Sequence, residues 1–475
     1  MKMQEKLTAI HLQALRILEH VGIILHHAEL IDMLKEHGVS VKDKTVYFKP
    51  DTVMDAVRRA PDSFTLHARN PCHDMIIGGN RVNCAPGYGC PTICRIDGSR
   101  RNAVMADYVR MAKLVHQCPH FSINGGILAQ PSDIPIDMSH LLMIYATLVS
   151  SDKCLMGVPG NATQLKTAIE LASIAFGGLE KFAARPHILS LVNLISPLQI
   201  DEMALDTMMI AARHNQPLVI SPSPAAGTTG PIDLAANIAL ATAEALAGIA
   251  IVQMIQPGTP VIFGLQCLGA DLKTGNISIG SPAYALQAKY AAALARMYHL
   301  PSRCGGALTD AAYLSPQSGY ESMLNMLATF QNGVNFVVHS AGILDSYSAI
   351  SYEKFIMDIE IIDMVQYYLN DAAVDPQTLN LELIRSVGPG GQFLTTMDTL
   401  QKCRTQSWNS SIGVRGKSDG GLQEETFLKN IAAKEIFMLD AYEPPTMDQM
   451  LHFELENFLI RQGVDQPLID KINYY

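Results

Sequence analysis

The chain has 475 residues, of which 48% are hydrophobic and only 17% are charged, and its formal net charge is −10. The negative charge argues against nucleic acid as a partner, because nucleic-acid binding requires a basic patch. Such sparse charge predicts a homo-oligomer, since exposed apolar surface needs cover. The nine cysteines are an odd number, and the start, Met1-Lys-Met-Gln-Glu-Lys, has no apolar signal region. We therefore expect a cytoplasmic protein with reduced thiols.

The amino-terminal part of the chain predicts a small α+β cap. Residues 5–37 hold two amphipathic helical patterns that end at Gly38, and residues 50–60 predict a third helix. Between residues 62 and 101, brief alternating runs are separated by turn residues, which is typical of β-hairpins. We assign this cap to residues 1–115.

A repeating pattern follows: a short apolar run, a break rich in Gly, Ser and Pro, and a long alanine-rich amphipathic segment. Each repeat has the length of one β-strand plus a crossover helix. The seven apolar runs are residues 121–125, 154–158, 187–191, 217–221, 260–264, 302–306 and 336–340. Repeated βα units with buried strands predict a parallel sheet, and seven or eight of them predict an α/β fold of the (β/α)8 TIM barrel type.

We assign the barrel to residues 116–420 and a carboxyl-terminal helical extension to residues 421–475. The eighth strand is expected in the glycine-rich segment 386–394, and two further helices are expected between residues 421 and 460. The barrel helices are expected at residues 137–151, 161–177, 200–214, 231–256, 281–299, 315–333 and 352–370.

One apolar segment, residues 235–255, is a candidate membrane span. It carries Asn237, Glu244 and Gln253, and its composition also suits a barrel helix packed between its neighbours. We therefore expect a soluble protein with no membrane partner.

Catalytic groups of a TIM barrel stand at the carboxyl ends of its strands. The substrate-binding residues expected there are Asn124, Gln266, Asp310, Tyr313, Gln317, Glu321, His339, Tyr347 and Phe355. The mouth is predicted to be nearly free of lysine and arginine, which favours a cationic or zwitterionic ligand over a phosphate ester. Structural roles remain open: Asp310 as a helix cap, His339 as a core histidine, Tyr347 as a packing residue, and Gln317 and Glu321 as a solvated helix face.

A bound metal is not expected, although His116 and Cys118 form a His-x-Cys pair of the kind found in some zinc sites. The pair lies just before the first predicted strand, at the rim opposite the catalytic face. No lysine stands in the seven apolar runs, which argues against an aldolase or lyase that forms a Schiff base.

Three stretches carry a resemblance to a known family: Gly305-Gly-Ala-Leu-Thr-Asp310 with Gln317-Ser-Gly-Tyr-Glu321, Ser351-Tyr-Glu-Lys-Phe-Ile-Met-Asp-Ile-Glu360, and Gly388-Pro-Gly-Gly-Gln-Phe-Leu394. Over nearly its whole length the chain resembles the trimethylamine methyltransferase family of corrinoid-dependent enzymes, which are (β/α)8 barrels. It has no pyrrolysine and is most similar to the branch that demethylates quaternary amines, in particular glycine betaine. The chain has Gln392 where the family motif often has histidine.

This resemblance implies transfer of a methyl group from glycine betaine to cob(I)alamin, with release of dimethylglycine. The corrinoid is expected on a separate carrier protein, because the chain has no Asp-x-His-x-x-Gly motif of the kind that holds cobalamin in such carriers. Gly390, Gly391 and Gln392 are the residues expected to contact it. Proline betaine, carnitine and γ-butyrobetaine remain alternative substrates, and a non-catalytic barrel that binds quaternary amines remains the alternative function. We expect an aromatic-walled pocket in which His339 and amide side chains anchor the carboxylate.

Overall fold

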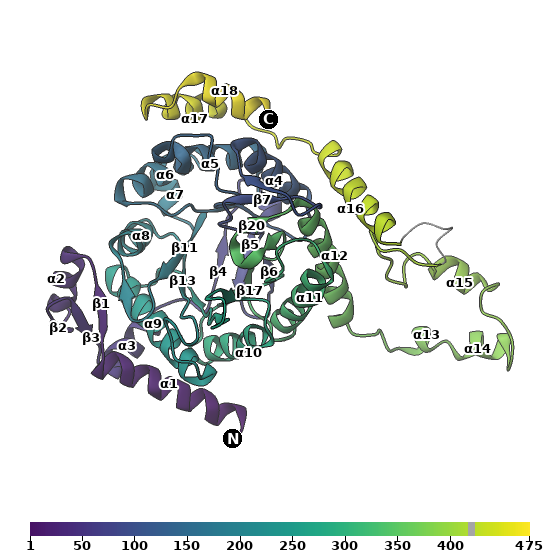
Figure 1. The fold of residues 1–475 in the computed structure, drawn as a ribbon, viewed down its shortest axis with the longest axis horizontal. Coiled ribbons are helices and arrows are strands. Elements are labelled where there is room, and N and C mark those ends of the chain that lie inside the picture. The colour runs from purple at the N-terminus through teal and green to yellow at the C-terminus, as the bar shows by residue number, and fades with distance from the viewer. Residues whose placement is uncertain (417–422) are drawn as a thin grey trace.

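The computed structural model describes residues 1–416 and 423–475 and has a barrel of eight parallel strands at its centre (Figure 1). An isolated parallel bridge between Cys84 and Phe121 joins the two edge strands and closes the ring. In their order around the sheet, the strands are β6 (Asn83–Cys84), β18 (Phe336–Val338), β17 (Ser302–Gly305), β14 (Val261–Gly264), β13 (Leu218–Pro222), β11 (Ile188–Leu194), β10 (Cys154–Met156) and β9 (Ile123–Gly125). The predicted fold class is confirmed, and seven of the strands overlap the seven predicted runs.

The strand that completes the barrel comes first in the chain and not last. The prediction of an eighth strand at residues 386–394 was wrong: this segment begins in the end of helix α14 (Leu381–Val387) and continues as a glycine-rich turn. The eighth strand is instead β6, whose two residues carry no apolar run and lie in a region that resembles β-hairpins. The predicted boundary at residue 115 therefore falls inside α4 (Met105–Gln117), the helix that follows β6.

One helix of the outer ring follows each barrel strand. In chain order these helices are α4, α5 (Ile136–Ser150), α6 (Ala162–Ala175), α8 (Glu202–Arg213), α9 (Leu234–Ile255), α10 (Pro282–Met297), α11 (Pro316–Gln331) and α12 (Tyr352–Leu369), and a short α7 (Leu179–Ala183) follows α6. Five begin at a side chain that accepts a backbone N–H of the first turn, which satisfies a donor that the helix itself cannot pair. These residues are Asn161, Asp201, Ser281, Ser315 and Ser351.

Helix α9 is long and apolar enough to cross a membrane by length and composition, but its apolar window is 94% buried inside the protein. It packs on strands β13 and β14 on one side and on α1 (Met3–His20) and α3 (Pro50–Val57) on the other. Its apolar composition is thus explained by burial on two sides, as expected for a barrel helix.

The amino-terminal segment packs against the outer flank of the barrel (Figure 1). It consists of α1, α2 (Ala28–Glu36), α3 and the strands β1 (Ile23–Leu25), β2 (Ser40–Lys42) and β3 (Thr45–Tyr47). Strand β1 also pairs in parallel with β12 (Gln199–Ile200), which belongs to the loop after β11. This shared sheet joins the cap to the barrel.

A β-hairpin of β4 (Ser63–Leu66) and β5 (Met75–Gly78) covers the amino-terminal end of the barrel. The backbone N–H of His67 donates to Pro186 O and that of Asn70 donates to Asp152 O, and both acceptors lie just before a barrel strand. Apolar side chains of the hairpin continue the cluster that fills the barrel interior. Ligands therefore reach the interior from the carboxyl-terminal mouth, where the active sites of such barrels lie.

Short strands surround that mouth. One sheet contains β7 (Thr92–Cys94), β8 (Arg100–Asn102), β19 (Ile343–Leu344) and β20 (Ala349–Ile350), and a separate hairpin contains β15 (Gly269–Ala270) and β16 (Ile277–Ser278). These strands lie in loops that follow β6, β14 and β18, so they bring residues from distant parts of the chain to the same opening.

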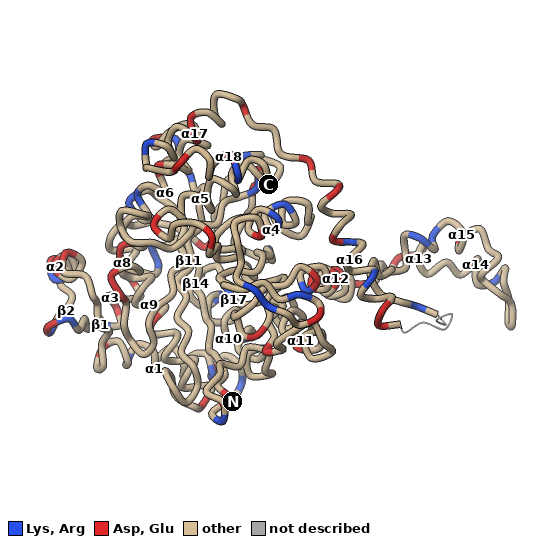
Figure 2. The backbone as a smooth tube through the Cα atoms, turned by 45° about the horizontal axis from the view of Figure 1, so that its top comes forward, with Lys and Arg blue, Asp and Glu red and all other residues tan. Residues whose placement is uncertain are grey.

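After α12 the chain leaves the barrel as an arm, residues 370–416, which extends away from the body in both backbone views (Figures 1 and 2). The arm contains the short helices α13 (Pro376–Leu379), α14 and α15 (Met397–Lys402). The chain then forms α16 (Gln423–Asp440), which packs on α12 and α4, followed by α17 (Gln449–Arg461) and α18 (Gln466–Tyr474), which pack on the barrel helices α4, α5 and α6. The two helices predicted between residues 421 and 460 correspond to α16 and α17.

Buried Glu244 of α9 should make stability depend on pH. Its carboxylate accepts hydrogen bonds from Leu198 N (2.6 Å) and Ser196 Oγ (2.8 Å), and burial raises its pKa from 4.5 to about 7. Because the folded state holds this proton more tightly than the unfolded state, stability falls as pH rises from about 4.5 to 7, by about 3 kcal/mol at most. Glu244→Gln, which keeps an acceptor for Leu198 and a donor for Ser196, should therefore be more stable than the wild type at pH 8 but not at pH 5.

Chemical denaturation at the two pH values measures this difference. Glu170→Gln, on the exposed face of α6, serves as the control and should change stability equally at both. A Glu244→Gln effect that is the same at pH 5 and pH 8 would contradict the assignment.

Candidate active site

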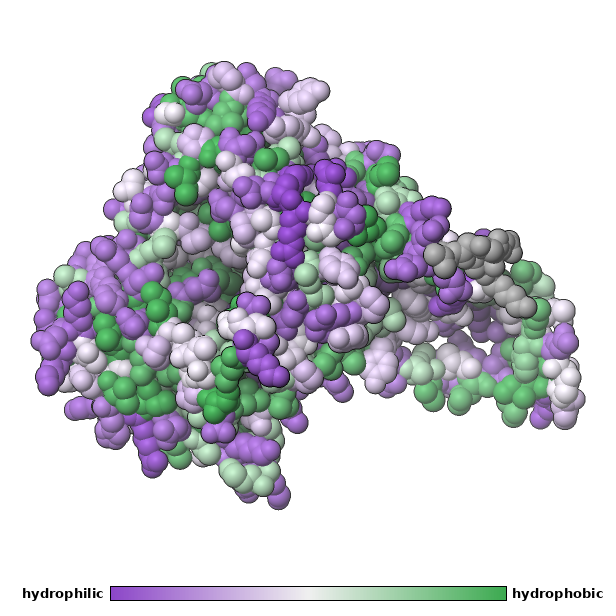
Figure 3. Space-filling view, viewed as in Figure 1, coloured by the Kyte–Doolittle hydropathy of each residue, from purple (hydrophilic) through white to green (hydrophobic). Residues whose placement is uncertain are grey.

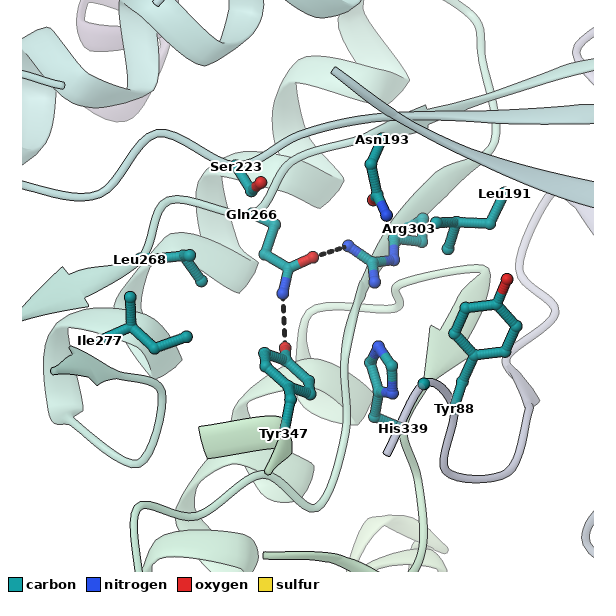
Figure 4. Close-up of a pocket in the computed structure, with 11 residues that line it drawn as sticks. Tyr88, Leu191, Asn193, Ser223, Gln266, Leu268, Ile277, Arg303, His339 and Tyr347 are labelled. Atoms are coloured by element: carbon teal, nitrogen blue, oxygen red, sulfur yellow. Dashed lines mark hydrogen bonds between the residues drawn. The ribbon is translucent and has the colours of Figure 1, made fainter. Parts of the chain in front are cut away.

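A cavity of about 310 Å³ opens at the carboxyl-terminal mouth, among loops that follow the barrel strands (Figure 4). Its lining residues are Tyr88, Gly89, Leu191, Asn193, Ser223, Gln266, Leu268, Ile277, Arg303, His339 and Tyr347. A second cavity of about 330 Å³ shares Tyr88, Gly89, Leu191 and Asn193 with the first, so the two adjoin at the mouth.

Arg303 of β17 is the cation of this cavity, and its side chain is only 1% exposed. Its Nη1 donates to Ser221 Oγ (3.1 Å) and to Gln266 Oε1 (2.5 Å), whereas its Nε has no hydrogen-bond partner. No carboxylate of the described residues lies within ion-pair distance of it. A buried charge without a counter-charge is costly, and here the missing counter-charge can be supplied by an anionic group of a ligand. The prediction that the mouth is nearly free of lysine and arginine was wrong at this residue.

Gln266 connects Arg303 to Tyr347 and fixes the orientation of both side chains. Its Oε1 accepts from Arg303, so its amide nitrogen faces Tyr347 and donates to the phenol oxygen at 2.5 Å. Figure 4 shows Gln266 between the two side chains. The phenol oxygen accepts this bond, and burial raises the pKa of Tyr347, so the hydroxyl stays protonated and its hydrogen can be donated to another group.

His339 faces the same cavity and is neutral. Burial, and secondarily the positive charge of Arg303, hold the pKa of His339 well below its usual range. Its Nδ1 has no hydrogen-bond partner among the described residues. The cavity therefore contains one cation and not two.

Three rings stand next to one another at this site. The His339 ring lies 4.9 Å from that of Tyr347 and 6.2 Å from that of Tyr88, centroid to centroid. His339 and Tyr347 both have a left-handed backbone, with φ of 60° and 76°, which non-glycine residues adopt at a cost. The loop after β6 helps hold this arrangement, because Pro86 O accepts from His339 N and Ala85 O accepts from Ser340 N.

A buried network on α11 supports the loop that carries Tyr347. Glu321 accepts from Thr309 Oγ1 (2.6 Å), Asp310 N (2.8 Å) and Gln317 Nε2 (2.9 Å). Asp310 in turn accepts from Ser346 Oγ (2.8 Å), the residue before Tyr347. Three predicted site residues, Asp310, Gln317 and Glu321, thus hold the loop of Tyr347 and do not line the cavity themselves. Asp310 lines a separate acidic cavity of about 500 Å³.

A fully buried ion pair on α12 supports the loop that carries His339. Lys354 Nζ donates to both carboxylate oxygens of Asp358, to Ser322 Oγ (2.8 Å) and to Ala307 O (3.3 Å). Asp358 also accepts from Gly342 N (2.8 Å), three residues after His339. Burial raises the pKa of Asp358 to about 6 although Lys354 opposes this shift. The pair thereby connects the loops after β17 and β18.

The structure brings three of the predicted substrate-binding residues, Gln266, His339 and Tyr347, together around one cavity. Asn124 is fully buried in β9, where its amide donates to Ala112 O and accepts from Gly125 N. Tyr313 is 53% exposed, and Phe355 is buried with its ring against Phe121.

Gly390, Gly391 and Gln392, the residues predicted to contact the corrinoid, lie on the exposed arm. Two of the glycines in this segment, Gly388 and Gly390, have positive φ values, and a Cβ on Gly391 would lie 2.2 Å from Val387 O. A tight turn therefore accounts for the glycines of this motif without a ligand.

Arg303 and Tyr88 line the cavity but are not among the residues predicted from the sequence to bind substrate. Arg303 lies inside a buried strand, and its charge within an otherwise uncharged apolar run is the signal that could have revealed it. Tyr88 lies in the amino-terminal region and reaches the cavity only because β6 is a barrel strand.

The described residues include no group of three or more His, Cys, Asp or Glu side chains placed to hold a metal ion. His116 hydrogen-bonds to Ser151 and lies 3.7 Å from Asp152, near the amino-terminal end of the barrel. Cys118 is fully buried, and burial raises the pKa of its thiol to about 12.

Comparison with known proteins identifies the family. The sequence model described as "Trimethylamine methyltransferase (MTTB)" matches residues 1–467. The chain belongs to this family of methyltransferases. It is 38% identical over 461 residues to the glycine betaine methyltransferase of Desulfitobacterium hafniense (strain Y51), with 97% of this chain and 96% of that protein covered. It is 28% identical to the proline betaine:corrinoid methyltransferase of Eubacterium limosum, with 90% of each covered.

Among solved structures, the fold is similar to the one described as the hydroxylamine MtmB complex. The TM-score is 0.53 at 11% sequence identity, with 96% of this chain and 88% of that chain covered. This similarity supports the barrel architecture.

The Lys354–Asp358 pair should be essential for stability and for the position of His339. Asp358→Asn should lower the free energy of unfolding by about 3–5 kcal/mol, because it leaves Lys354 charged and buried without its partner. The double variant Lys354→Met/Asp358→Leu should cost less than the sum of its single changes, since neutral side chains leave no isolated charge. Denaturant titration of the wild type, Asp358→Asn, Lys354→Met, Asp358→Leu and the double variant measures both effects.

Lys35→Met, which breaks the exposed Lys35–Asp32 pair of α2, is the control and should cost less than about 1 kcal/mol. If Asp358→Asn costs as little as this control, the pair does not have the structural role assigned to it.

Proposed function

We propose that this protein transfers a methyl group from glycine betaine to the reduced cobalt of a corrinoid on a separate carrier protein and releases dimethylglycine. The observation that carries the proposal is Arg303, a buried cation without a carboxylate partner among the described residues, beside three aromatic rings. Glycine betaine carries both groups that this site requires: a carboxylate and a quaternary ammonium.

The carboxylate of the substrate supplies the negative charge that Arg303 lacks. A guanidinium can donate two parallel hydrogen bonds to a carboxylate, and such charge-assisted bonds are stronger than neutral ones. Arg303 has unused donors, because its described hydrogen bonds come from Nη1 alone. The phenol of Tyr347 and the amide of Asn193 are further donors that line the cavity.

The N-methyl groups are placed against Tyr88, Tyr347 and His339. Aromatic faces attract a quaternary ammonium through cation–π interaction. Neutral His339 is compatible with this cation, whereas a protonated ring would repel it. Contact with the ammonium must stay moderate, because its positive charge decreases in the transition state and strong binding would favour the ground state.

The size of the cavity is compatible with a compact substrate. At about 310 Å³ it lies near the lower end of the roughly 300–1,000 Å³ range of small-molecule sites. Proline betaine and carnitine also carry a carboxylate and a quaternary ammonium, and relatives named for both share this family. These substrates are the second candidates, because the chain is less similar to their relatives than to the glycine betaine methyltransferase.

The reaction requires this chain to position the substrate and to exclude water from the cavity, and acid or base catalysis is less important. The leaving group is a neutral tertiary amine, so no proton must be supplied. Arg303 orients the substrate through its carboxylate, and the apolar side chains of Leu191, Leu268 and Ile277 exclude water. The corrinoid supplies the nucleophile, and the carrier protein presents it from the mouth because the hairpin β4–β5 covers the other end.

Arg303 should discriminate between ligands with and without a carboxylate. Arg303→Met should weaken glycine betaine binding by about 10- to 100-fold, the effect of losing a hydrogen bond to a charged group worth about 1.5–3 kcal/mol. Choline has the same ammonium but no carboxylate, so its binding should not weaken. Isothermal titration with both ligands measures the ratio.

Thermal unfolding separates this role from a structural one. Removal of an unpaired buried charge should leave the melting temperature of Arg303→Met equal to or above that of the wild type. Equal weakening of both ligands, or loss of the folded state, would contradict the assignment.

A panel of N-methylated compounds with free cob(I)alamin tests the reaction itself. With glycine betaine, the cob(I)alamin spectrum should convert to that of methylcob(III)alamin, with one dimethylglycine formed for each methyl group transferred. Proline betaine, carnitine, γ-butyrobetaine and trimethylamine should react more slowly. Binding of glycine betaine without spectral change would indicate a binding protein and would overturn the proposal.

A further inference from the structure

The arm, residues 370–416, returns to the body only near its end, where Ser410 and Ser411 hydrogen-bond to Glu360 of α12 and Ile412 is buried. None of its residues before Ile412 is buried, and between residues 371 and 405 every hydrogen bond stays within the arm. Figures 1 and 2 show it extending from the ends of α12 and α16 away from the barrel.

Apolar side chains cover this arm. Figure 3 shows green residues along much of its visible surface. The exposed large hydrophobic residues are Val374, Leu379, Leu381, Ile384, Phe393, Leu394, Met397 and Leu400, with exposed fractions from 45% to 80%. Such a concentration on a protein surface marks an interaction site.

The local structure of the arm also requires a partner. Its helices α13, α14 and α15 have 4, 7 and 6 residues. Isolated helices shorter than about 12–15 residues are marginal in water and depend on packing of an apolar face. The arm therefore has a helical conformation that its own contacts do not stabilise.

A second apolar patch lies where the arm leaves the body. It comprises Met364, Tyr367, Tyr368 and Leu369 at the end of α12. Tyr367 Oη donates a hydrogen bond to Gln406 O of the arm, but the four residues of this patch remain 38–69% exposed. One chain thus presents both an apolar arm and an apolar surface beside its origin.

We infer that the arm binds a second copy of this chain and covers the patch at the end of α12 of that copy. A two-fold pairing uses the same two surfaces twice, so each arm and each patch is buried in one symmetric contact. The arm is longer than the roughly 20–30 residues that one side of a stable interface uses.

The charge of the arm favours a second copy of this chain over a partner that is attracted electrostatically. The arm has four acidic and four basic residues and is neutral, whereas the whole chain has a net charge of −10. Two of the basic residues pair within the arm, Arg385 with Glu382 and Lys402 with Asp398. A neutral apolar arm can approach a second acidic copy without repulsion and carries no charged surface for an oppositely charged carrier.

Sedimentation velocity on the full chain tests the pairing. The wild type should sediment as a dimer or a multiple of it, and Leu379→Glu/Leu394→Glu/Leu400→Glu should sediment as the 51.7 kDa monomer. The control Leu12→Glu/Val21→Glu/Leu179→Glu changes three other exposed apolar residues, outside the arm and the patch, and should remain associated. A monomeric wild type, or an associated arm variant, would overturn the inference.

A photo-crosslinking residue at position 394 tests which surface receives the arm. The cross-linked product should have twice the mass of the chain, and its peptides should come from the end of α12. Cross-links confined to one chain, or to a carrier protein when that protein is added, would overturn the inference. Neither experiment depends on the proposed methyl transfer, so the two proposals fail separately.

Discussion

A guanidinium buried in the barrel without a carboxylate constrains the rest of the mouth. The unpaired charge of Arg303 is costly in a dry interior. The neutral dipoles of Ser221 and Gln266 reduce this cost but do not cancel it. The charge of Arg303 is neutralised only when an anionic group of a ligand enters the cavity. The same charge helps to keep His339 neutral, because a second cation beside the first would be more costly still. The charge of Arg303 thus explains both the preference for an anionic ligand group and the neutral state of His339.

The geometry of the cavity depends on a layer of buried polar groups behind it. His339 and Tyr347 have backbone conformations that cost energy, so the surrounding structure must hold them. Glu321 and Asp310 hold the loop of Tyr347, and the Lys354–Asp358 pair holds the loop of His339. These four supporting residues lie in the segments on which the family resemblance rests. Much of that resemblance therefore lies in residues that support the loops of Tyr347 and His339, and not in residues that line the cavity.

The periodicity of the sequence predicts the barrel because seven strands are continuous apolar runs followed by amphipathic helices. It does not predict β6, since two residues, Asn83 and Cys84, are too few to carry a periodic signal. The glycine-rich segment after residue 386 stands where an eighth repeat is expected. The position after a strand predicts Gln266, His339 and Tyr347. It does not reveal Arg303, which lies within a strand, or Tyr88, which reaches the mouth only through β6. Nothing in the local pattern indicates that Asp310 and Glu321 bond to backbone groups.

The position of Arg303 also bears on which quaternary amines the cavity rejects. Two positive charges about 5 Å apart repel by about 3 kcal/mol at an effective dielectric constant near 20. A ligand with an ammonium group and no carboxylate meets this repulsion in full, because Arg303 has no other counter-charge among the described residues. A betaine brings its own carboxylate, which neutralises Arg303 as the ammonium enters. On the proposed function, one residue therefore attracts betaines and repels simple amines, so the specificity of the site does not require a separate element that excludes trimethylamine.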